Sequence, residues 1–410
     1  MRFLFSPFGT AGDVYPMLGA AIELKSRGHE VTFITNGYFE EAVTRHGIEY
    51  VELGTKQEFL DSTANADLWH PMRGFRHVFE TLIASALGRQ YEAFERLFQR
   101  GPSLGIVNVF GFGGLLAREK LRVPIVTLHV QPAVVWSRIE PPRLPGIRGP
   151  RWLQDLQFRL GERFFIDRTV CPRLNELRRE LGLPSVRRIA HWWHSPDGVV
   201  CTFPDWFAPA QPDWPANTVQ TDFPLWDEES QQLPPEIEAF LAAGSAPLVF
   251  TPGSGNQFGA KFFQAAVDAA GRLQRRAILC TPFPEQLPRK LPTSVISSAY
   301  APFSRLLPRA AAMVHHGGVG TTAQALAAGI PQLIMPLAHD QFDNAARVAR
   351  LGIGDSLSPA RFTGKALARK LDPLLTSSDV ADRCRALAAR LVNRDGCQRT
   401  ATVLERWATA

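Results

Sequence analysis

The run HHGGVGTT, at positions 315–322, gathers the residue types that bind phosphate groups. It follows a short apolar run of β type and precedes a helical run, so we expect a turn from a strand into a helix. Glycines let the backbone approach a bulky anion closely, and the free amides of a helix start can donate hydrogen bonds to it. Thr321, Thr322 and a histidine can add further donors. The run predicts a diphosphate site; a glycine turn beside a core histidine is the structural alternative.

The run PLAHDQ, at positions 336–341, also follows a predicted strand. Asp340 supplies hydrogen-bond acceptors and Gln341 supplies an amide, a pair suited to gripping sugar hydroxyls. Asp340 would also be a good N-cap for the helix that follows. The sequence alone does not separate these two interpretations, and the role of the neighbouring His339 is equally open.

The first loop, GTAGDVYP at positions 9–16, admits three interpretations: a dinucleotide loop, a capped helix start, or a loop that holds a catalytic carboxylate. A dinucleotide loop needs G-x-G-x-x-G and an acid at the end of the second strand. Here the glycines are spaced as Gly9-x-x-Gly12, and the second strand ends at Thr35-Asn36. A nicotinamide-dependent dehydrogenase is therefore disfavoured. Asp13 suits a helix N-terminus, and the same position can present its carboxylate to a ligand.

Short β-type runs and helical runs alternate along both halves of the chain, which predicts parallel sheets with right-handed crossovers. We expect an α/β protein of two Rossmann-like, doubly wound domains facing across a cleft, with ligands at the carboxyl ends of the strands. The expected parts are an N-terminal domain, a polar linker with several prolines, a C-terminal domain, and a C-terminal helix that can pack back on the first domain: residues 1–225, 226–245, 246–394 and 395–410.

The composition is that of an ordinary globular protein, since 45% of the 410 residues are hydrophobic and 20% are charged. The five cysteines are scattered without a C-x-x-C pair, which favours free thiols in a reducing compartment. No apolar run approaches the ~20 residues that a transmembrane helix needs. We therefore expect a cytoplasmic protein.

The formal net charge of +6 is concentrated in one stretch, residues 138–188, which holds twelve arginines and no lysine against six acidic residues. The functional interpretation is a weak peripheral contact with an anionic membrane surface. The structural alternative, which we favour, is a solvated helical face with structural arginines. A nucleic-acid partner is disfavoured because no binding motif accompanies the charge.

The segments HHGGVGTT, AAGIPQLIMPLAHDQFDNAARV and GTAGDVYP together resemble the signatures of the inverting UDP-glycosyltransferase family, which has the GT-B fold. The likeness is greatest to its bacterial rhamnosyltransferase and sterol-glucosyltransferase members. The resemblance implies a hexosyltransferase that uses a UDP-linked or dTDP-linked sugar, such as UDP-glucose or dTDP-rhamnose, and a lipophilic acceptor, as in natural-product glycosylation. It also implies that the N-terminal domain binds the acceptor and the C-terminal domain binds the nucleotide sugar. The scheme needs no cofactor or metal, and the chain has no D-x-D metal motif.

The resemblance assigns the donor site residue by residue. His316 corresponds to the histidine that binds the diphosphate, and Asp340 and Gln341 to the pair that holds the sugar. Tyr300 and Ala301 fall where plant members have the tryptophan that stacks on uracil, so the base, uridine or thymidine, stays open. The expected donor-binding residues are Thr10, Ser254, Tyr300, Ala301, His316, Gly318, Gly320, Thr321, Asp340 and Gln341.

Two residues are expected to be catalytic, Asp13 and His129. Asp13 occupies the position of the catalytic histidine of plant members, and Asn108 stands where the acid that orients that histidine is expected. The resemblance therefore implies a single carboxylate base, which takes the acceptor proton late because an ionised carboxylate is weakly basic. His129 ends another predicted strand and is either a second base, an acceptor contact or a packed histidine.

Two other functions remain open at this point. One is a non-catalytic subunit that binds a nucleotide sugar; the other is a sugar-nucleotide epimerase on the same fold. The presence of both Asp13 and the donor motif argues against the first. An epimerase would turn over the donor without any acceptor.

Overall fold

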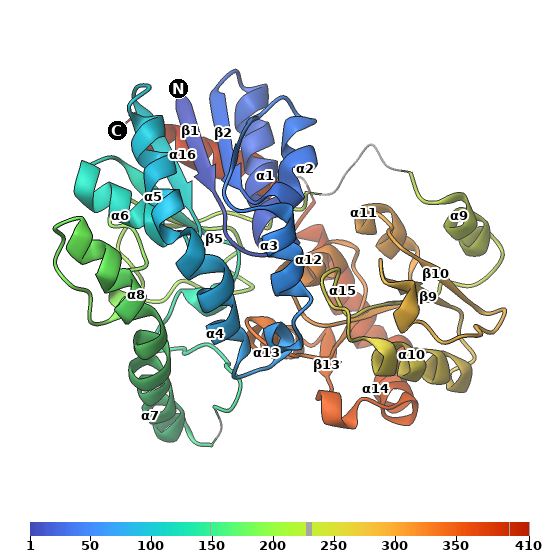
Figure 1. Ribbon diagram of the computed structural model, residues 1–410. Helices are drawn as coiled ribbons and strands as arrows, with labels where there is room; N and C mark the ends of the chain where they lie inside the picture. Colours follow the sequence, from blue (N-terminus) through green and yellow to red (C-terminus); the bar gives the residue numbers. More distant parts are fainter. Residues whose placement is uncertain (148, 227–231, 393, 410) are drawn as a thin grey trace. The chain divides into compact units, whose positions relative to one another are not determined.

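The computed structural model of the protein describes residues 1–410 except 148, 227–231, 393 and 410. The chain divides into two compact units. Unit 1 comprises Met1–Pro224 and Asp395–Ala410, and unit 2 comprises Leu225–Arg394. Each unit is an α/β structure built on one parallel sheet (Figure 1).

Unit 1 contains a seven-stranded sheet in the order β3-β2-β1-β4-β5-β6-β7. The strands are β1 (Arg2–Ser6), β2 (Glu30–Thr35), β3 (Glu49–Glu52), β4 (Ser103–Val107), β5 (Ile125–His129), β6 (Val199–Cys201) and β7 (Thr218–Gln220). All neighbouring pairs are parallel. The carboxyl ends of the strands therefore lie along one edge of the sheet, where β1 leads into the glycine-containing first loop.

The helices of unit 1 are α1 (Ala11–Ser26), α2 (Glu40–Thr44), α3 (Lys56–Thr63), α4 (Gly74–Val78), α5 (Ala84–Phe98), α6 (Phe112–Leu121), α7 (Arg151–Gly161), α8 (Asp167–Glu180) and α16 (Gly396–Thr409). Short π-helical segments, Phe79–Ile83 and Glu162–Ile166, join α4 to α5 and α7 to α8. The core contains the buried side chains of β1 and of α5.

Unit 2 contains a six-stranded parallel sheet in the order β10-β9-β8-β11-β12-β13. Its strands are β8 (Leu248–Thr251), β9 (Ala277–Cys280), β10 (Val295–Ser298), β11 (Ala312–His315), β12 (Gln332–Ile334) and β13 (Gly354–Ser356). Its helices are α9 (Pro235–Ala242), α10 (Ala260–Arg272), α11 (Phe303–Leu306), α12 (Val319–Ala327), α13 (Gln341–Arg350), α14 (Gly364–Thr376) and α15 (Ser378–Ala389).

The segment expected to be a linker, residues 226–245, is only partly described, because residues 227–231 lie outside the described part of the chain. Its second half forms α9, whose buried Ile237 and Leu241 pack in a hydrophobic cluster of unit 2. Two prolines at the start of α9 suit a helix N-terminus and explain why this stretch resembles a linker in sequence. Within the described residues, no helix is both long enough and apolar enough to cross a lipid bilayer.

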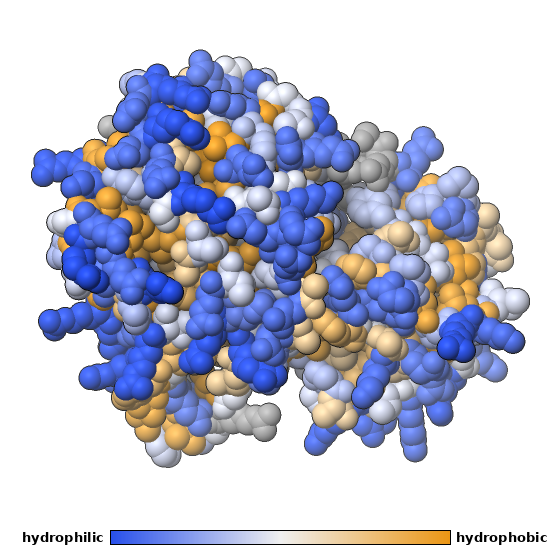
Figure 2. Space-filling view, viewed as in Figure 1, coloured by the Kyte–Doolittle hydropathy of each residue, from blue (hydrophilic) through white to orange (hydrophobic). Residues whose placement is uncertain are grey.

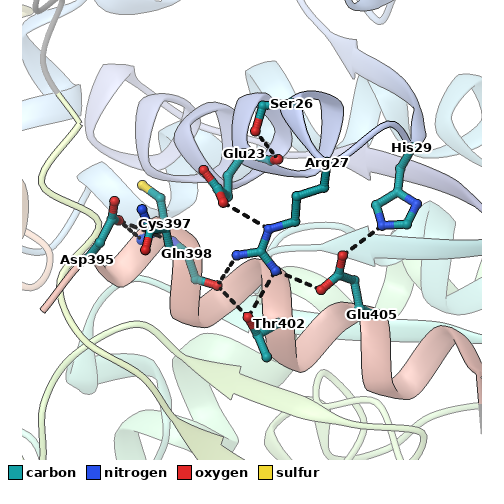
Figure 3. Close-up of polar contacts among 9 residues, drawn as sticks. All are labelled: Glu23, Ser26, Arg27, His29, Asp395, Cys397, Gln398, Thr402 and Glu405. Carbon is teal, nitrogen blue, oxygen red and sulfur yellow. Dashed lines mark hydrogen bonds and ion pairs between the residues drawn. The ribbon is translucent and has the colours of Figure 1, made fainter.

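The C-terminal helix α16 packs on α1 within unit 1 (Figure 3). Arg27 donates hydrogen bonds to Glu405 at 2.7 Å and to Thr402 at 3.0 Å, and His29 lies 2.7 Å from the other oxygen of Glu405. Arg399 pairs with the buried carboxylate of Asp222. These bonds tie the last helix to the first helix and to the segment after β7.

Gly396 lets α16 begin against the backbone of unit 1. A Cβ atom at this position would lie 2.3 Å from the carbonyl oxygen of Phe223 and 2.4 Å from that of Asp222. A backbone cannot move aside as a flexible side chain can. Only a residue without a Cβ fits.

We expect Gly396→Ala to destabilise unit 1 by about 1–3 kcal/mol, because the added methyl overpacks a site lined by backbone. The matched control is Gly88→Ala in α5, where a Cβ meets nothing within 4 Å. That control should raise stability by about 0.5–1 kcal/mol through helix propensity. Urea unfolding followed by tryptophan fluorescence reports mainly on unit 1, which contains every tryptophan except Trp226. Equal stabilities for the two variants would contradict the close packing of α16.

Candidate functional site

Asp13 lies in the first turn of α1, and its carboxylate folds back over the preceding loop. Its Oδ2 accepts a hydrogen bond from the backbone N–H of Thr10, the N-cap, at 3.1 Å. Gly9 has φ +130°, and a Cβ atom there would lie 2.2 Å from Asp13 Oδ2. The carboxylate therefore occupies space that only glycine leaves free.

Asn108 fixes the loop that carries this carboxylate. It follows β4 directly and is buried. Its Oδ1 accepts the N–H of Phe8 at 3.1 Å, and its Nδ2 donates to the carbonyl oxygen of Phe8 at 2.5 Å. An amide side chain satisfies both backbone groups, whereas an ionised carboxylate would accept from one and repel the other. This contact explains why an amide stands where an acid was expected.

His129 is the last residue of β5, is buried, and forms part of a chain of hydrogen bonds. Its Nε2 lies 2.9 Å from Nδ1 of His194, and Nε2 of His194 lies 2.9 Å from the indole N–H of Trp193. The indole can only donate, so His194 carries its own proton on Nδ1 and donates it to His129. Burial lowers the pKa of His194 to about 4 and that of His129 well below its usual value. His129 is therefore neutral, with its Nε2 lone pair already in use.

His316 follows β11, and its ring is enclosed by glycine backbone in unit 2. A Cβ atom at Gly253, in the turn after β8, would lie 3.0–3.1 Å from three ring atoms. A Cβ atom at Gly318 would lie 2.6 Å from Nε2. Burial, with a smaller effect of nearby His339, lowers the pKa of His316 to about 4. The imidazole is neutral and keeps one N–H donor in a fixed orientation.

The residues that we expect to bind an anion lie at the start of α12, but the hydroxyl of one of them is already hydrogen-bonded. Gly318 is the N-cap, and Gly320 and Thr321 lie in the first turn, partly exposed. The Thr322 hydroxyl, expected as a further donor, is instead bonded to the carbonyl oxygen of Gly318 at 3.0 Å. Ser254 is exposed in the turn after β8.

The adjacent His315 belongs to the core. It is fully buried, accepts the N–H of Gly317 on Nδ1 at 3.1 Å, and lies 3.0 Å from the side-chain oxygen of Gln332 through Nε2. Both ring nitrogens are therefore used by the fold. Of the paired histidines, His316 alone is placed at the turn beside the start of α12.

Asp340 occupies the N-cap position of α13, but its side chain does not cap that helix. It accepts a hydrogen bond from Nδ2 of Asn344 at 2.6 Å and another from the backbone N–H of Val319 at the start of α12. The preceding His339 has φ +56°, a left-handed conformation that is uncommon outside glycine and that sets the direction of this turn. Burial raises the pKa of Asp340 to about 7, and the bond from Asn344 opposes the rise.

Gln341 is buried, and the oxygen of its side-chain amide is hydrogen-bonded within its own loop. Its Oε1 accepts the backbone N–H groups of Leu337 at 2.7 Å and Ala338 at 3.1 Å. The NH₂ end is the part left for a ligand. Tyr300 and Ala301 follow β10, where the Tyr300 ring is about half exposed and Ala301 is buried.

The structure therefore gathers the expected residues into two groups, each at the carboxyl edge of its own sheet. Thr10, Asp13 and His129 belong to unit 1, and the others belong to unit 2. Sequence reasoning missed three residues that hold these groups in place: Asn108, His194 and Asn344. The only signal for Asn108 was its position at the end of a predicted strand. Nothing in the local pattern marks His194, whereas Asn344 lies four residues after Asp340, a spacing at which side chains of one helix meet.

Two family models match the chain. The glycosyltransferase family 28 N-terminal domain matches residues 3–126. The C-terminal domain of the erythromycin biosynthesis protein CIII-like family matches residues 265–404.

Known proteins are similar over nearly the whole chain. O-mycaminosyltylonolide 6-deoxyallosyltransferase of Streptomyces fradiae is 28% identical, over 100% of this chain and 98% of that protein. The solved structure of a glycotransferase of kitacinnamycin has a TM-score of 0.75 at 20% identity and covers 99% of both chains. That of the spinosyn rhamnosyltransferase SpnG, complexed with thymidine diphosphate, has a TM-score of 0.69 at 20% identity and covers 99% of this chain and 100% of that one.

The raised pKa of Asp340 predicts a pH-dependent stability. The folded protein keeps this carboxyl protonated up to pH about 7, whereas an unfolded chain ionises it near pH ~4. Ionisation in the fold is therefore unfavourable, and this group lowers the free energy of unfolding as the pH rises between these values. We expect Asp340→Asn to gain stability relative to the wild type on going from pH 5 to pH 8, measured by urea unfolding with circular dichroism.

The control for this measurement is Asp372→Asn, which removes an exposed carboxylate from α14 in the same unit. Its stability relative to the wild type should change little between the two pH values. A flat difference for Asp340→Asn as well would show that Asp340 is ionised normally in the fold.

Proposed function

Since the chain is a glycosyltransferase of the UDP-glycosyltransferase family with the GT-B fold, we propose that it moves a hexose from a nucleoside-diphosphate sugar to a hydroxyl of a lipophilic small-molecule or lipid acceptor. Transfer inverts the anomeric carbon, and Asp13 is the general base. The observation that carries this proposal is the Asp13 carboxylate, held over Gly9 at the carboxyl edge of the unit 1 sheet.

The diphosphate of the donor is assigned to the turn around His316. The neutral ring can donate one hydrogen bond, and the first amides of α12 lie beside it. Gly318, Gly320 and Thr321 would line the phosphates, with Ser254 from the turn after β8. As the bond to the sugar breaks, negative charge builds on the leaving diphosphate, and fixed donors of this kind stabilise it without reorganising.

The sugar is assigned to Asp340 and to the NH₂ end of Gln341. The carboxyl group of Asp340 is already oriented by Asn344, so a sugar hydroxyl would meet a hydrogen-bonding group in a fixed position. Tyr300 offers an exposed ring on which the base can stack. A thymidine diphosphate donor is supported by the ligand of the spinosyn rhamnosyltransferase, and a uridine donor is the alternative.

In the transfer step, the acceptor oxygen bonds to the anomeric carbon while the bond from that carbon to the diphosphate breaks. The acceptor proton passes to Asp13, and the bonding pair leaves with the diphosphate. A carboxylate is a weak base towards an alcohol, so the proton moves late, once the acceptor oxygen has become acidic. We assign proton transfer to Asp13 alone, because His194 already occupies the Nε2 lone pair of His129. His129 would then contact the acceptor substrate by donating a hydrogen bond from its Nδ1–H.

A lipophilic acceptor of natural-product type is supported by the relative from Streptomyces fradiae, whose name specifies a glycosylated tylonolide. Contact of this chain with an anionic membrane surface is a separate proposal. Arg148 of the basic stretch 138–188 lies outside the described residues, and the side chains that would make the contact lie on α7 and the π-helical segment after it.

We expect Asp13→Asn to slow transfer by about 10²–10⁴-fold, the usual contribution of a positioned general base. Donor affinity should stay within a factor of about two, because Asp13 belongs to the acceptor step. Product is measured by mass spectrometry with UDP-glucose, dTDP-glucose and dTDP-rhamnose against a panel of lipophilic alcohols, and donor binding by calorimetry. Full transfer activity in the variant would remove Asp13 as the base; donor consumption without an acceptor would indicate an epimerase.

The position of the Asp13 carboxylate is tested by two glycines of one turn. Gly9→Ala places a methyl where the carboxylate lies, so kcat should fall by at least about tenfold as Asp13 is displaced. Gly12→Ala is the matched control, because its Cβ would meet only the Thr10 hydroxyl, at 3.9 Å. That variant should keep kcat close to the wild type. A Gly9→Ala enzyme with unchanged kcat would show that catalysis does not depend on this carboxylate position.

A further inference from the structure

We propose that α7 and the π-helical segment after it dock on an anionic lipid bilayer through one exposed apolar face. The face consists of four side chains spaced four residues apart, here called the α7 stripe: Trp152, Leu156, Leu160 and Phe164, which are 70%, 47%, 46% and 51% exposed. A spacing of four places them in one row along a helix. Figure 2 shows hydrophobic residues gathered over the position that α7 has in Figure 1.

The opposite side of α7 is anchored, so the stripe is held facing outward. Phe158 is buried and packs edge-on against Trp136, with ring centroids 4.7 Å apart. Trp136 in turn packs against Trp193 at 4.6 Å. Rolling the helix to hide the stripe would expose Phe158 and break this contact. The packing of Phe158 therefore keeps the α7 stripe exposed.

The charges around the stripe are separated by sign. Arg163 and Arg168 lie over the Phe164 ring, 5.8 Å and 5.1 Å from its centroid, and neither forms an ion pair within the described part of the chain. The acidic residues that precede each of these arginines in sequence, Glu162 and Asp167, are buried and pair with Arg188. At this end of the stripe the carboxylates point inward and the guanidinium groups remain outside. The surface thus presents apolar side chains beside uncompensated positive charge.

This combination fits a bilayer better than a protein partner. A helix with Trp, Phe and Leu on one face and arginines at its border lies in the plane of a membrane interface, and anionic lipids attract the arginines. A standard protein interface buries about 800 Å² on each partner, which is large for a row of four side chains. In a two-fold dimer through the stripe, the same arginines of both copies would face a common patch. An anionic bilayer therefore matches this face in both hydrophobicity and charge.

The stripe is also connected to the carboxyl edge of the unit 1 sheet. Behind Phe158, the ring contacts reach Trp193, which donates to His194, and His194 bonds to His129 at the end of β5. A chain of aromatic contacts and hydrogen bonds thus links the membrane-facing helix α7 to His129, to which we assign an acceptor contact. The docking proposal rests on the exposed face alone and does not need the proposed transfer reaction to be correct.

The test is co-sedimentation of the full chain with vesicles of phosphatidylcholine alone and of phosphatidylcholine mixed with phosphatidylglycerol. We expect binding to the mixed vesicles that weakens as salt is added. Leu156→Ser with Leu160→Ser should lower the partition coefficient by at least about tenfold, because the apolar anchor is lost. Leu60→Ser, another partly exposed leucine on a helix of unit 1, is the matched control and should bind as the wild type does.

A second variant separates charge from hydrophobicity. Arg163→Gln with Arg168→Gln should remove most of the preference for phosphatidylglycerol while leaving the thermal transition unchanged. Equal binding of the stripe variant and the wild type would overturn the proposal. A dimer in sedimentation equilibrium that requires the α7 stripe, without vesicle binding, would also overturn it. So would a stripe variant that differs from the wild type only in its KM for the acceptor. Transfer measured on a water-soluble acceptor without vesicles reports on the proposed function separately.

Discussion

A single amide, the side chain of Asn108, fixes the chemistry-bearing loop of unit 1. It bonds to both backbone groups of Phe8 and so holds the residue that precedes Gly9. Gly9 then takes a conformation with positive φ, and the Asp13 carboxylate fills the space where a side chain would have been. Each step depends on the one before it. A glycine turn therefore holds the Asp13 carboxylate, which we propose as the base, and Asn108 stands where plant members of the family carry a second carboxylate.

In unit 2, His316, to which we assign the diphosphate, also lies against glycine backbone. A Cβ atom at Gly253 or Gly318 would lie 2.6–3.1 Å from the ring of His316, and one at Gly9 would lie 2.2 Å from the Asp13 carboxylate. In both places, the side chain of Asp13 or His316 occupies space that a Cβ atom on the neighbouring glycine would fill. Asp340 is held differently, by Asn344 and by the first amide of α12, and it follows a residue in the left-handed conformation. A site built in this way is oriented before the substrates arrive, which is the condition for electrostatic catalysis.

Much of this arrangement could be predicted from the sequence because it is local. The apolar runs of β1, β4, β5 and β11, and the turns that follow them, can be read from periodicity and glycine spacing. The edge strands β7 and β13 could not, because TVQ and GDS have too few apolar residues to mark a strand. The roles of Asn108, His194 and Asn344 depend on contacts that span four to a hundred positions. The contacts of Asn108 and His194 follow from the folded sheet and leave no pattern in the sequence, whereas Asn344 lies one helical turn from Asp340.

If Asp13 removes the acceptor proton, its substitution should matter only for acceptors that still carry that proton, and two acceptors that differ in this respect can be compared. One is an alcohol, and the other is a phenol of similar shape that is already ionised at the assay pH. We expect the Asp13→Asn variant to transfer slowly to the alcohol but nearly as fast as the wild type to the phenolate, because no proton remains to be removed. An equal loss of rate on both acceptors would contradict it, since Asp13 would then act on the sugar or on the fold instead.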